Sequence, residues 1–162
     1  MTATAPRTED PTAADAVLYR FTGYAMKRAY MRVQDAVSAR LSEMGLRIGT
    51  FSALGVVATN PGISQSRLSE ILQIKRSGIV VVVDELERVG VLERSAVPGD
   101  RRMYALSVTP GGHRLWRKAE AAVRVTEAEL FATLDAGETE ILRHLLAKAA
   151  RGATADGGGD PE

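Results

Sequence analysis

One segment of the sequence, residues 13–44, has the pattern of a helix that is too long for a compact domain. Its apolar side chains recur at steps of three and four residues, which places them on one helical face, and Gly45 follows as a helix terminator. At ~1.5 Å per residue such a helix spans roughly 48 Å, whereas a compact chain of this size has a radius of gyration of about 15 Å. The sequence therefore predicts a helix that projects from its own domain and needs a partner for its apolar stripe: Val17, Leu18, Phe21, Tyr24, Ala25, Ala29, Val33, Val37, Leu41 and Met44.

The rare residues of the chain exclude several classes of site. The sequence has no cysteine and 2 histidines, so we expect no disulfide, no thiolate-bound metal and no cofactor. His113 and His144 lie in two different predicted helices, without serine or carboxylate partners at spacings typical of a triad or metal site. The sequence thus predicts neither catalytic nor metal-ligating residues, and a protein that is not an enzyme.

The chain also lacks the features of a membrane or secreted protein. No apolar run reaches the roughly 20 residues that span a bilayer. The N-terminal sequence MTATAPRTEDPTAADA lacks the basic and then apolar order of a signal peptide. We therefore expect a cytoplasmic protein without a membrane partner.

The charge is distributed unevenly along the chain. Residues 62–118 carry 10 basic and 6 acidic side chains, whereas residues 119–162 carry 4 basic and 9 acidic ones. A basic middle and an acidic end suggest that the middle of the chain faces something anionic.

The middle of the chain reads as three short helices followed by two strands. Helices are predicted at 50–59, from Ser64 as an N-cap, and at 76–89, and strands at 91–95 and 103–108 with the linker 96–102 between them. Thr109 and Pro110 then begin a helix to about Leu134, and a last helix follows Asp135. Three helices and a two-stranded hairpin form the winged helix-turn-helix arrangement, in which the third helix lies in the DNA major groove.

The third of these helices contains the run IVVVV, whose β-branched residues favour strands, while the following DELERVG favours a helix. In the helical interpretation one face is apolar and points inward, at Ile79, Val82, Val83, Leu86 and Val89. The opposite face then points outward. Its residues are Lys75, Arg76, Ser77, Gly78, Val80, Val81 and Asp84.

Two segments of the chain resemble the MarR family of bacterial transcriptional regulators. They are NPGISQSRLSEILQIKRSGIVVVVDELERVGVLER and PGDRRMYALSVTPGGHRL, and the second is similar to the family's Asp-x-Arg wing signature and the strand-to-helix junction after it. The resemblance covers roughly residues 15–150. It implies a mainly α fold with a small β-hairpin wing, in which a winged helix-turn-helix lobe is joined to a helical dimerisation layer.

The resemblance also implies a domain organisation. We expect a single domain over residues 13–150, with a DNA-binding lobe at 50–109 and dimerisation helices at 13–45 and 120–150. Residues 1–12 and 151–162 have few side chains to bury and are expected to be disordered tails. The implied protein is a homodimer that binds a pseudo-palindromic operator in double-stranded DNA.

The family motif places the DNA contacts at three sites. Polar side chains begin the helix that would cross the backbone, basic residues begin the recognition helix, and the wing carries a minor-groove arginine, Arg102, that Asp100 would orient. Val80 and Val81 stand where the family more often has polar or basic residues, which predicts thin base readout that favours thymine methyl groups. The expected contacts are Ser64, Gln65, Ser66, Lys75, Arg76, Ser77, Gly78, Val80, Val81, Arg94, Asp100, Arg101 and Arg102.

The resemblance further implies a small-molecule pocket between the dimerisation layer and the DNA-binding lobe. The segment GYAMKRAYMRVQ is similar to first helices of MarR-type regulators of aromatic-acid catabolism. An aromatic and arginine lining would suit an aromatic acid or its thioester as an effector, although core packing would also account for these aromatic side chains. The candidate ligand residues are Tyr24, Arg28, Tyr30, Met31, Arg32 and Phe51.

Two functions are compatible with the sequence. The first is a dimeric, ligand-responsive DNA-binding regulator, most simply a repressor that its effector releases. The alternative is a helical protein-interaction module whose winged helix no longer reads DNA, since the run of valines and the modest charge offer little for base recognition. Salt-dependent DNA binding separates the two.

Overall fold

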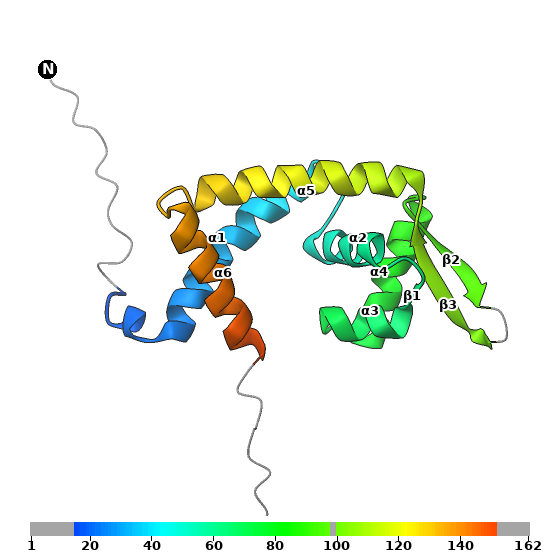
Figure 1. Ribbon diagram of the computed structural model, residues 1–162, viewed down its shortest axis with the longest axis horizontal. Helices are drawn as coiled ribbons and strands as arrows, with labels where there is room; N and C mark the ends of the chain where they lie inside the picture. Colours follow the sequence, from blue (N-terminus) through cyan, green and yellow to red (C-terminus); the bar gives the residue numbers. More distant parts are fainter. Residues whose placement is uncertain (1–14, 98–99, 152–162) are drawn as a thin grey trace, which may run out of the picture.

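The computed structural model describes residues 15–97 and 100–151, except for the side chains of Val97 and residues 100–103. It consists of a compact lobe and a pair of outlying helices that one long helix, α5 (Pro110–Leu130), joins (Figure 1). The lobe contains α2 (Ile48–Thr59), α3 (Gln65–Leu72), α4 (Arg76–Arg88) and a sheet. The outlying part contains α1 (Thr22–Ser42) and α6 (Ala136–Arg151), preceded by the 3₁₀ turn η1 (Leu18–Arg20). The predicted mainly α, winged fold is confirmed.

The sheet has three antiparallel strands in the order β1-β3-β2, where the sequence predicted a two-stranded hairpin. The added strand is β1 (Ile63–Ser64), in which Ile63 pairs with Leu106. The hairpin strands β2 (Leu92–Val97) and β3 (Asp100–Val108) run further than predicted, because pairing continues through a bulge to Val97 and Asp100. The expected linker 96–102 is thus mostly strand.

The predicted helix over residues 13–44 is interrupted. Phe21 is extended, with φ −102° and ψ 116°, and α1 begins only at Thr22. Asp15 explains the break, since its carboxylate accepts a hydrogen bond from Tyr24 and lies 3.7 Å from Arg28, which folds the preceding segment back against the helix. The 21 residues of α1 span about 31 Å rather than the expected 48 Å.

Several helix ends follow the signals in the sequence. Ser64 caps α3, and Thr109 caps α5 by accepting a hydrogen bond from the Gly112 N–H at 3.0 Å. Asp135 and Glu138 form a reciprocal capping box before α6, with bonds of 2.9 and 2.8 Å. Other ends differ, because α2 begins at Ile48 rather than at residue 50 and α5 ends at Leu130 rather than at about Leu134.

The core of the molecule lies in the lobe and extends under α5. Leucines from α1, α2, α3, α4 and β3 are fully buried there, among them Leu41, Leu54, Leu68, Leu86 and Leu106. Ala119 brings the middle of α5 into the same cluster. One continuous core therefore fixes the lobe to the start of the connecting helix.

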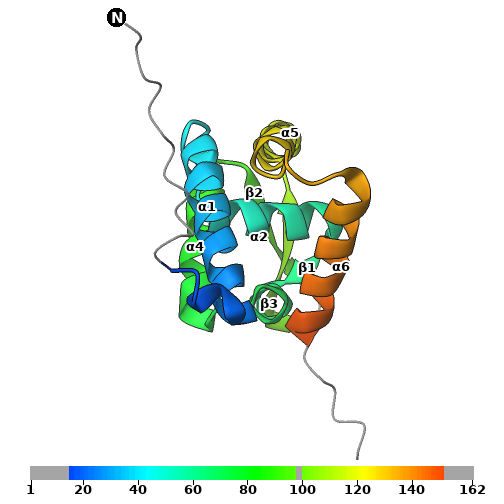
Figure 2. The same ribbon diagram turned by 90° about the vertical axis from the view of Figure 1, so that its left-hand side faces the viewer.

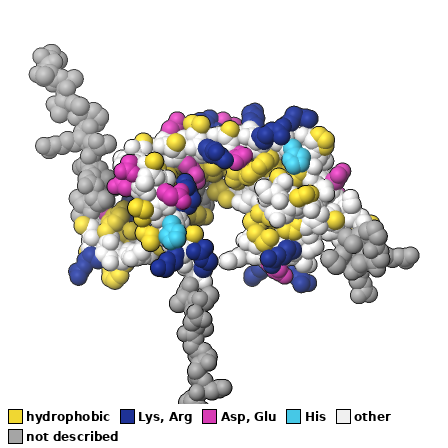
Figure 3. Space-filling model, in the orientation of Figure 1, with side chains coloured by type: hydrophobic (Ala, Val, Ile, Leu, Met, Phe, Trp, Pro, Cys, Tyr) yellow, Lys and Arg dark blue, Asp and Glu magenta, His cyan; other side chains and the backbone are white. Residues whose placement is uncertain are grey.

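Helix α6 lies outside this core. None of its residues is buried, and it does not pack extensively against any other element of the described chain. Seen along α5, α1 and α6 descend on opposite sides of that helix (Figure 2). Hydrophobic side chains are visible over this outlying part (Figure 3), and Ile141 and Leu145 of α6 are 61% and 54% exposed.

Candidate nucleic-acid interface

Helices α3 and α4 are joined by a tight turn that local residues specify. Ser64 accepts a hydrogen bond from the Arg67 N–H at 3.1 Å and begins α3. Gln73 adopts the left-handed conformation that ends α3, with φ 53°. Ser69, buried beneath the turn, donates to the carbonyl of Ile74 at 2.6 Å. The turn thus has the short length of a helix-turn-helix motif.

Helix α4 presents the face that the sequence predicted. Ile79, Val83 and Leu86 are buried, whereas Val80 and Val81 are 40% and 60% exposed. The run IVVVV is therefore helical, and its second and third residues face outward. The prediction was wrong for Val89, which is 53% exposed, because the helix ends at Arg88 and Val89 is its C-cap.

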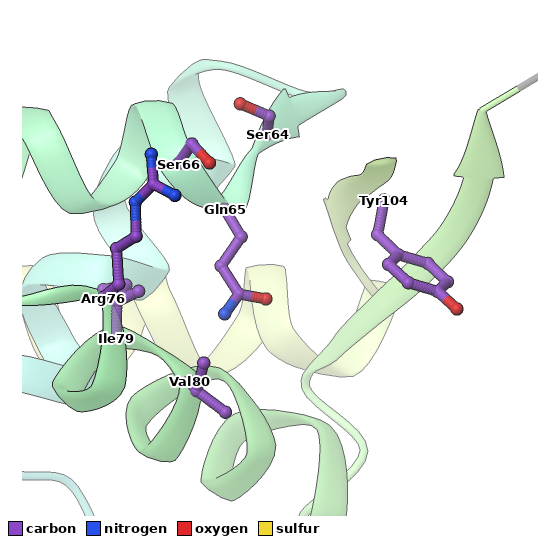
Figure 4. Close-up of a pocket in the computed structure, with 7 residues that line it drawn as sticks. All are labelled: Ser64, Gln65, Ser66, Arg76, Ile79, Val80 and Tyr104. Carbon is purple, nitrogen blue, oxygen red and sulfur yellow. The ribbon is translucent and has the colours of Figure 1, made fainter. Parts of the chain in front are cut away.

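An open groove of about 440 Å³ lies between the start of α3, the first turns of α4 and strand β3 (Figure 4). Gln65 extends from α3 toward Val80, and Arg76 rises from α4 beside Ser66 (Figure 4). Tyr104 of β3, which was not among the predicted contacts, is 48% exposed and also lines the groove. The lining residues are Ser64, Gln65, Ser66, Arg76, Ile79, Val80 and Tyr104.

The other expected contacts of α3 and α4 lie around this groove. Lys75 is the N-cap of α4, with Arg76 at its first position, and both are exposed. Ser77 is exposed as well, whereas Gly78 is half-buried. Of the expected contacts, the structure thus brings five together in the groove, with the others of α4 next to them along the helix. The five are Ser64, Gln65, Ser66, Arg76 and Val80. The side chains of Asp100, Arg101 and Arg102 lie outside the described part of the wing.

Arg94, which the sequence predicted as a phosphate contact, forms ion pairs within the protein instead. Its guanidinium donates to Asp84 and to Glu87 of α4, and its side chain is 18% exposed. Burial lowers the pKa of Arg94, but the hydrogen bond to Asp84 and the charge of Glu87 outweigh that effect and raise it. The arginine thus fixes β2 of the wing to the outer side of α4.

A second arginine also pairs with the C-terminal half of α4. Arg47, the N-cap of α2, donates to Glu85. Asp84, Glu85 and Glu87 are therefore all paired with arginines from neighbouring elements. These pairs leave the N-terminal half of α4, where Arg76, Val80 and Val81 lie, as its unobstructed surface.

The six candidate ligand residues fall into separate groups. Tyr24 and Arg28 meet at Asp15, and the hydrogen bond to Asp15 raises the pKa of Tyr24 above its ordinary value. Phe51 of α2 stacks on Trp116 of α5, with ring centroids 4.9 Å apart. The remaining three residues are exposed on α1: Tyr30, Met31 and Arg32.

Neither hollow described for this chain includes these six residues. The groove beside α4 is lined by residues of α3, α4 and the sheet. A second hollow, of about 330 Å³ between α1 and α5, is lined by Arg40, Glu43, Met44, Lys118, Ala122 and Val125. Trp116, the sole tryptophan, was not among the predicted site residues. Its position in the apolar series Leu115, Trp116, Ala119 and Val123, at steps typical of a helix, was the signal that could have indicated it.

The described residues, 15–97 and 100–151, also bear on metal sites and membrane spans. Within these ranges no group of three or more histidine, aspartate or glutamate side chains is arranged to hold a metal ion. None of the described helices is both long and apolar enough to cross a membrane.

Comparison with known proteins reveals a consistent set of relatives. A model of the MarR family matches residues 44–103. The chain is 39% identical over 102 residues to a protein of Thauera aromatica named as a transcriptional regulator of the hcr operon. That match covers 63% of this chain and 61% of the Thauera protein, so the chain matches less than two thirds of that relative's length.

Solved structures match over more of the chain. The transcriptional repressor CouR, bound to a 23-mer DNA duplex, is 31% identical with a TM-score of 0.78, and the match covers 82% of this chain and 94% of CouR. Rv2887 of Mycobacterium tuberculosis in complex with salicylic acid is 29% identical with a TM-score of 0.65, covering 80% of this chain and 96% of that one. Rv2887 has also been solved in complex with DNA, with 27% identity, a TM-score of 0.67, and 80% and 97% of the two chains covered.

Proposed function

Because the chain belongs to the MarR family of transcriptional regulators, we propose that it is a dimeric repressor that binds operator DNA and that a small aromatic acid, or its thioester, releases. The observation that carries this proposal is the position of α4. Its N-terminal half is exposed, begins with Lys75 and Arg76, and borders an open groove with the start of α3. A helix N-terminus of this kind favours phosphate and presents side chains to base edges.

We assign the DNA contacts to three groups of residues. Ser64, Gln65 and Ser66 would contact the backbone or the groove edge, and the first two turns of α4 would enter the major groove. The wing arginines would contact phosphates and the minor groove, as the family motif implies. Arg94 is the exception, because its ion pairs with Asp84 and Glu87 engage its guanidinium, and we assign it the role of holding the wing. The assigned set is Ser64, Gln65, Ser66, Lys75, Arg76, Ser77, Gly78, Val80, Val81, Asp100, Arg101 and Arg102.

We infer that α1, α5 and α6 form the dimer interface. The exposed apolar side chains of α6 support this inference, since an isolated amphipathic helix gains little stability without packing. The DNA-binding lobe would extend over residues 50–109 and the dimerisation helices over 13–45 and 120–150. The tails that the sequence predicted, 1–12 and 151–162, lie outside the described residues, except for Arg151, which ends α6.

The effector site is the second part of the proposal. Tyr24 and Arg28 lie together on α1 and would hold a carboxylate and a phenol. Phe51 stacks on Trp116 in a separate group, so we leave it out of this site. That Rv2887, a relative of similar length, has been solved with salicylic acid supports this chemistry. In a dimer, the exposed Tyr30, Met31 and Arg32 would face the partner or the effector. We propose no catalytic role, and a DNA-binding regulator of this family would act in the cytoplasm.

The test is DNA binding by the full-length protein to the intergenic DNA upstream of its own gene. We expect a complex whose affinity falls steeply as salt rises, because phosphate contacts release counterions, and whose half-sites lie about 10 bp apart. Specific binding has to exceed binding to random duplex at physiological salt. Equal affinity for both duplexes would favour the alternative, a protein-interaction module, for which the exposed valines of α4 are the supporting observation.

A further inference from the structure

The outward face of α4 is poor in groups that can read bases by hydrogen bonds. Beyond its first turn, the exposed residues are Val80, Val81 and Asp84 in the middle of the helix and Glu87 and Arg88 in its last turn. The carboxylate of Asp84 is engaged by Arg94. A valine side chain has no donor or acceptor, so the middle of this helix is unable to hydrogen-bond to base edges.

Valine does, however, fit one feature of the major groove. The C5-methyl group of thymine is the apolar group that this groove presents, and small apolar side chains contact it. The two valines are adjacent and 40% and 60% exposed, so each has apolar surface that contact with a methyl group would remove from water. The two valine side chains can therefore contact the methyl group of thymine, and a G·C pair presents no methyl group for them to contact.

Gln65 supplies the polar group that α4 lacks. It is the first residue of α3, and it lines the same groove as Val80. Its side chain extends across the groove toward Val80, with the amide at the α4 side (Figure 4). A side-chain amide donates to and accepts from adenine at N6 and N7 in a paired geometry.

We propose that the base specificity of this protein is directed at A·T pairs, with Gln65 reading adenine and Val80 and Val81 reading thymine methyl groups. This inference rests on the proposed DNA-binding function. It assigns the hydrogen-bonding readout to the helix before α4 and the apolar readout to α4 itself. Arg76 and Lys75, at the helix start, would add affinity that is independent of sequence.

The test begins with 30-bp duplexes that the wild-type protein selects from a random library. Each thymine of the selected half-site is then replaced in turn by deoxyuridine, which removes only the methyl group. We expect two or more positions at which the wild type binds several-fold more weakly to the deoxyuridine duplex. Because this change is made in the DNA, it does not depend on how any variant folds.

Variants then assign the positions to residues. A Val80→Ala/Val81→Ala double variant is expected to show a smaller preference for thymine over deoxyuridine than the wild type, because alanine has less apolar surface to contact the methyl group. Val89→Ala, at an exposed valine outside the groove, is the matched control and should keep the wild-type preference. Gln65→Ala is expected to lose about 5- to 150-fold of discrimination between A·T and G·C at one position, the range for a paired base contact. Thermal unfolding confirms that each variant is folded.

The outcomes separate this inference from the proposed function. Specific, salt-dependent binding that is indifferent to every deoxyuridine replacement would overturn the readout by valine and leave the DNA-binding function intact. A thymine preference that is undiminished in Val80→Ala/Val81→Ala, or an A·T preference that is undiminished in Gln65→Ala, would overturn the assignment to these residues. If no duplex is enriched and binding to random DNA is absent, both proposals fail.

Discussion

The indole ring of Trp116 lies directly against the backbone of Gly55, where a β-carbon on that glycine would stand 2.5 Å from the ring. This contact brings α5 close to α2, and Phe51, one helical turn before Gly55, stacks on the same indole with ring centroids 4.9 Å apart. The glycine is buried within α2, so the fit depends on the missing side chain. The contact determines how the connecting helix leaves the lobe.

Replacement of Gly55 by alanine tests this fit. We expect Gly55→Ala to destabilise the protein by about 1–3 kcal/mol, because the indole has to move within a packed core. The control is Gly23→Ala in the first turn of α1, where nothing lies within 4 Å and alanine is expected to be neutral or slightly stabilising. Thermal unfolding measures both variants, and an equal effect of the two would show that the Trp116 contact is not constrained.

The second prediction concerns the effect of Asp15 on the affinity for carboxylate effectors. Its carboxylate already accepts from Tyr24 and lies 3.7 Å from Arg28, so it competes with an incoming carboxylate for the same donors. We therefore expect Asp15→Asn to bind salicylate severalfold more tightly than the wild type does. Isothermal titration calorimetry measures the two affinities.

A neutral analogue and a second variant control this experiment. Salicylamide lacks the carboxylate charge, so Asp15→Asn should not change its affinity. Arg28→Gln should weaken salicylate binding, because it removes the cation that the carboxylate would face. Unchanged salicylate affinity in both variants would place the effector site elsewhere.

The third prediction concerns the contribution of α6 to the dimer. Leu145 lies in its apolar stripe and is 54% exposed, and we expect it to be buried in a dimer. Leu145→Glu should then yield a monomer at micromolar concentration in sedimentation equilibrium, because burial of an unpaired charge is costly. Ala147→Glu adds the same charge on the opposite face of α6 and should remain dimeric. A wild-type monomer would contradict the proposed interface.

Local signals in the sequence predicted several helix starts. Ser64 and Thr109 cap α3 and α5, and α6 follows Asp135 as expected, because a cap depends on residues only a few positions apart. The helical periodicity of α4 likewise identified Ile79 and Val83 as buried despite their preference for strands. Packing against α2 and α3 decides the conformation there.

Long-range contacts explain what the sequence did not predict. The helix break at Phe21 depends on the side chain of Asp15 reaching Tyr24 and Arg28, and β1 depends on pairing with Leu106, far along the chain. Arg94 pairs with Asp84 and Glu87 of α4. These pairs could not be predicted from the sequence, in which the position of Arg94 beside the wing suggested a phosphate contact instead. The groove was only partly predicted, because Tyr104 enters it from β3.

Val81→Arg gives the most direct test of the recognition face. Val81 is 60% exposed, so an arginine there would extend into solvent, and we expect the thermal stability to stay within about 0.5 kcal/mol of the wild type. If α4 lies in the major groove, the added charge strengthens binding to random duplex and makes that binding more sensitive to salt. Val89→Arg, on a similarly exposed valine at the C-cap of α4, is the control for the charge alone. A stable Val81→Arg protein that binds random DNA no better than Val89→Arg would show that this face of α4 does not meet DNA.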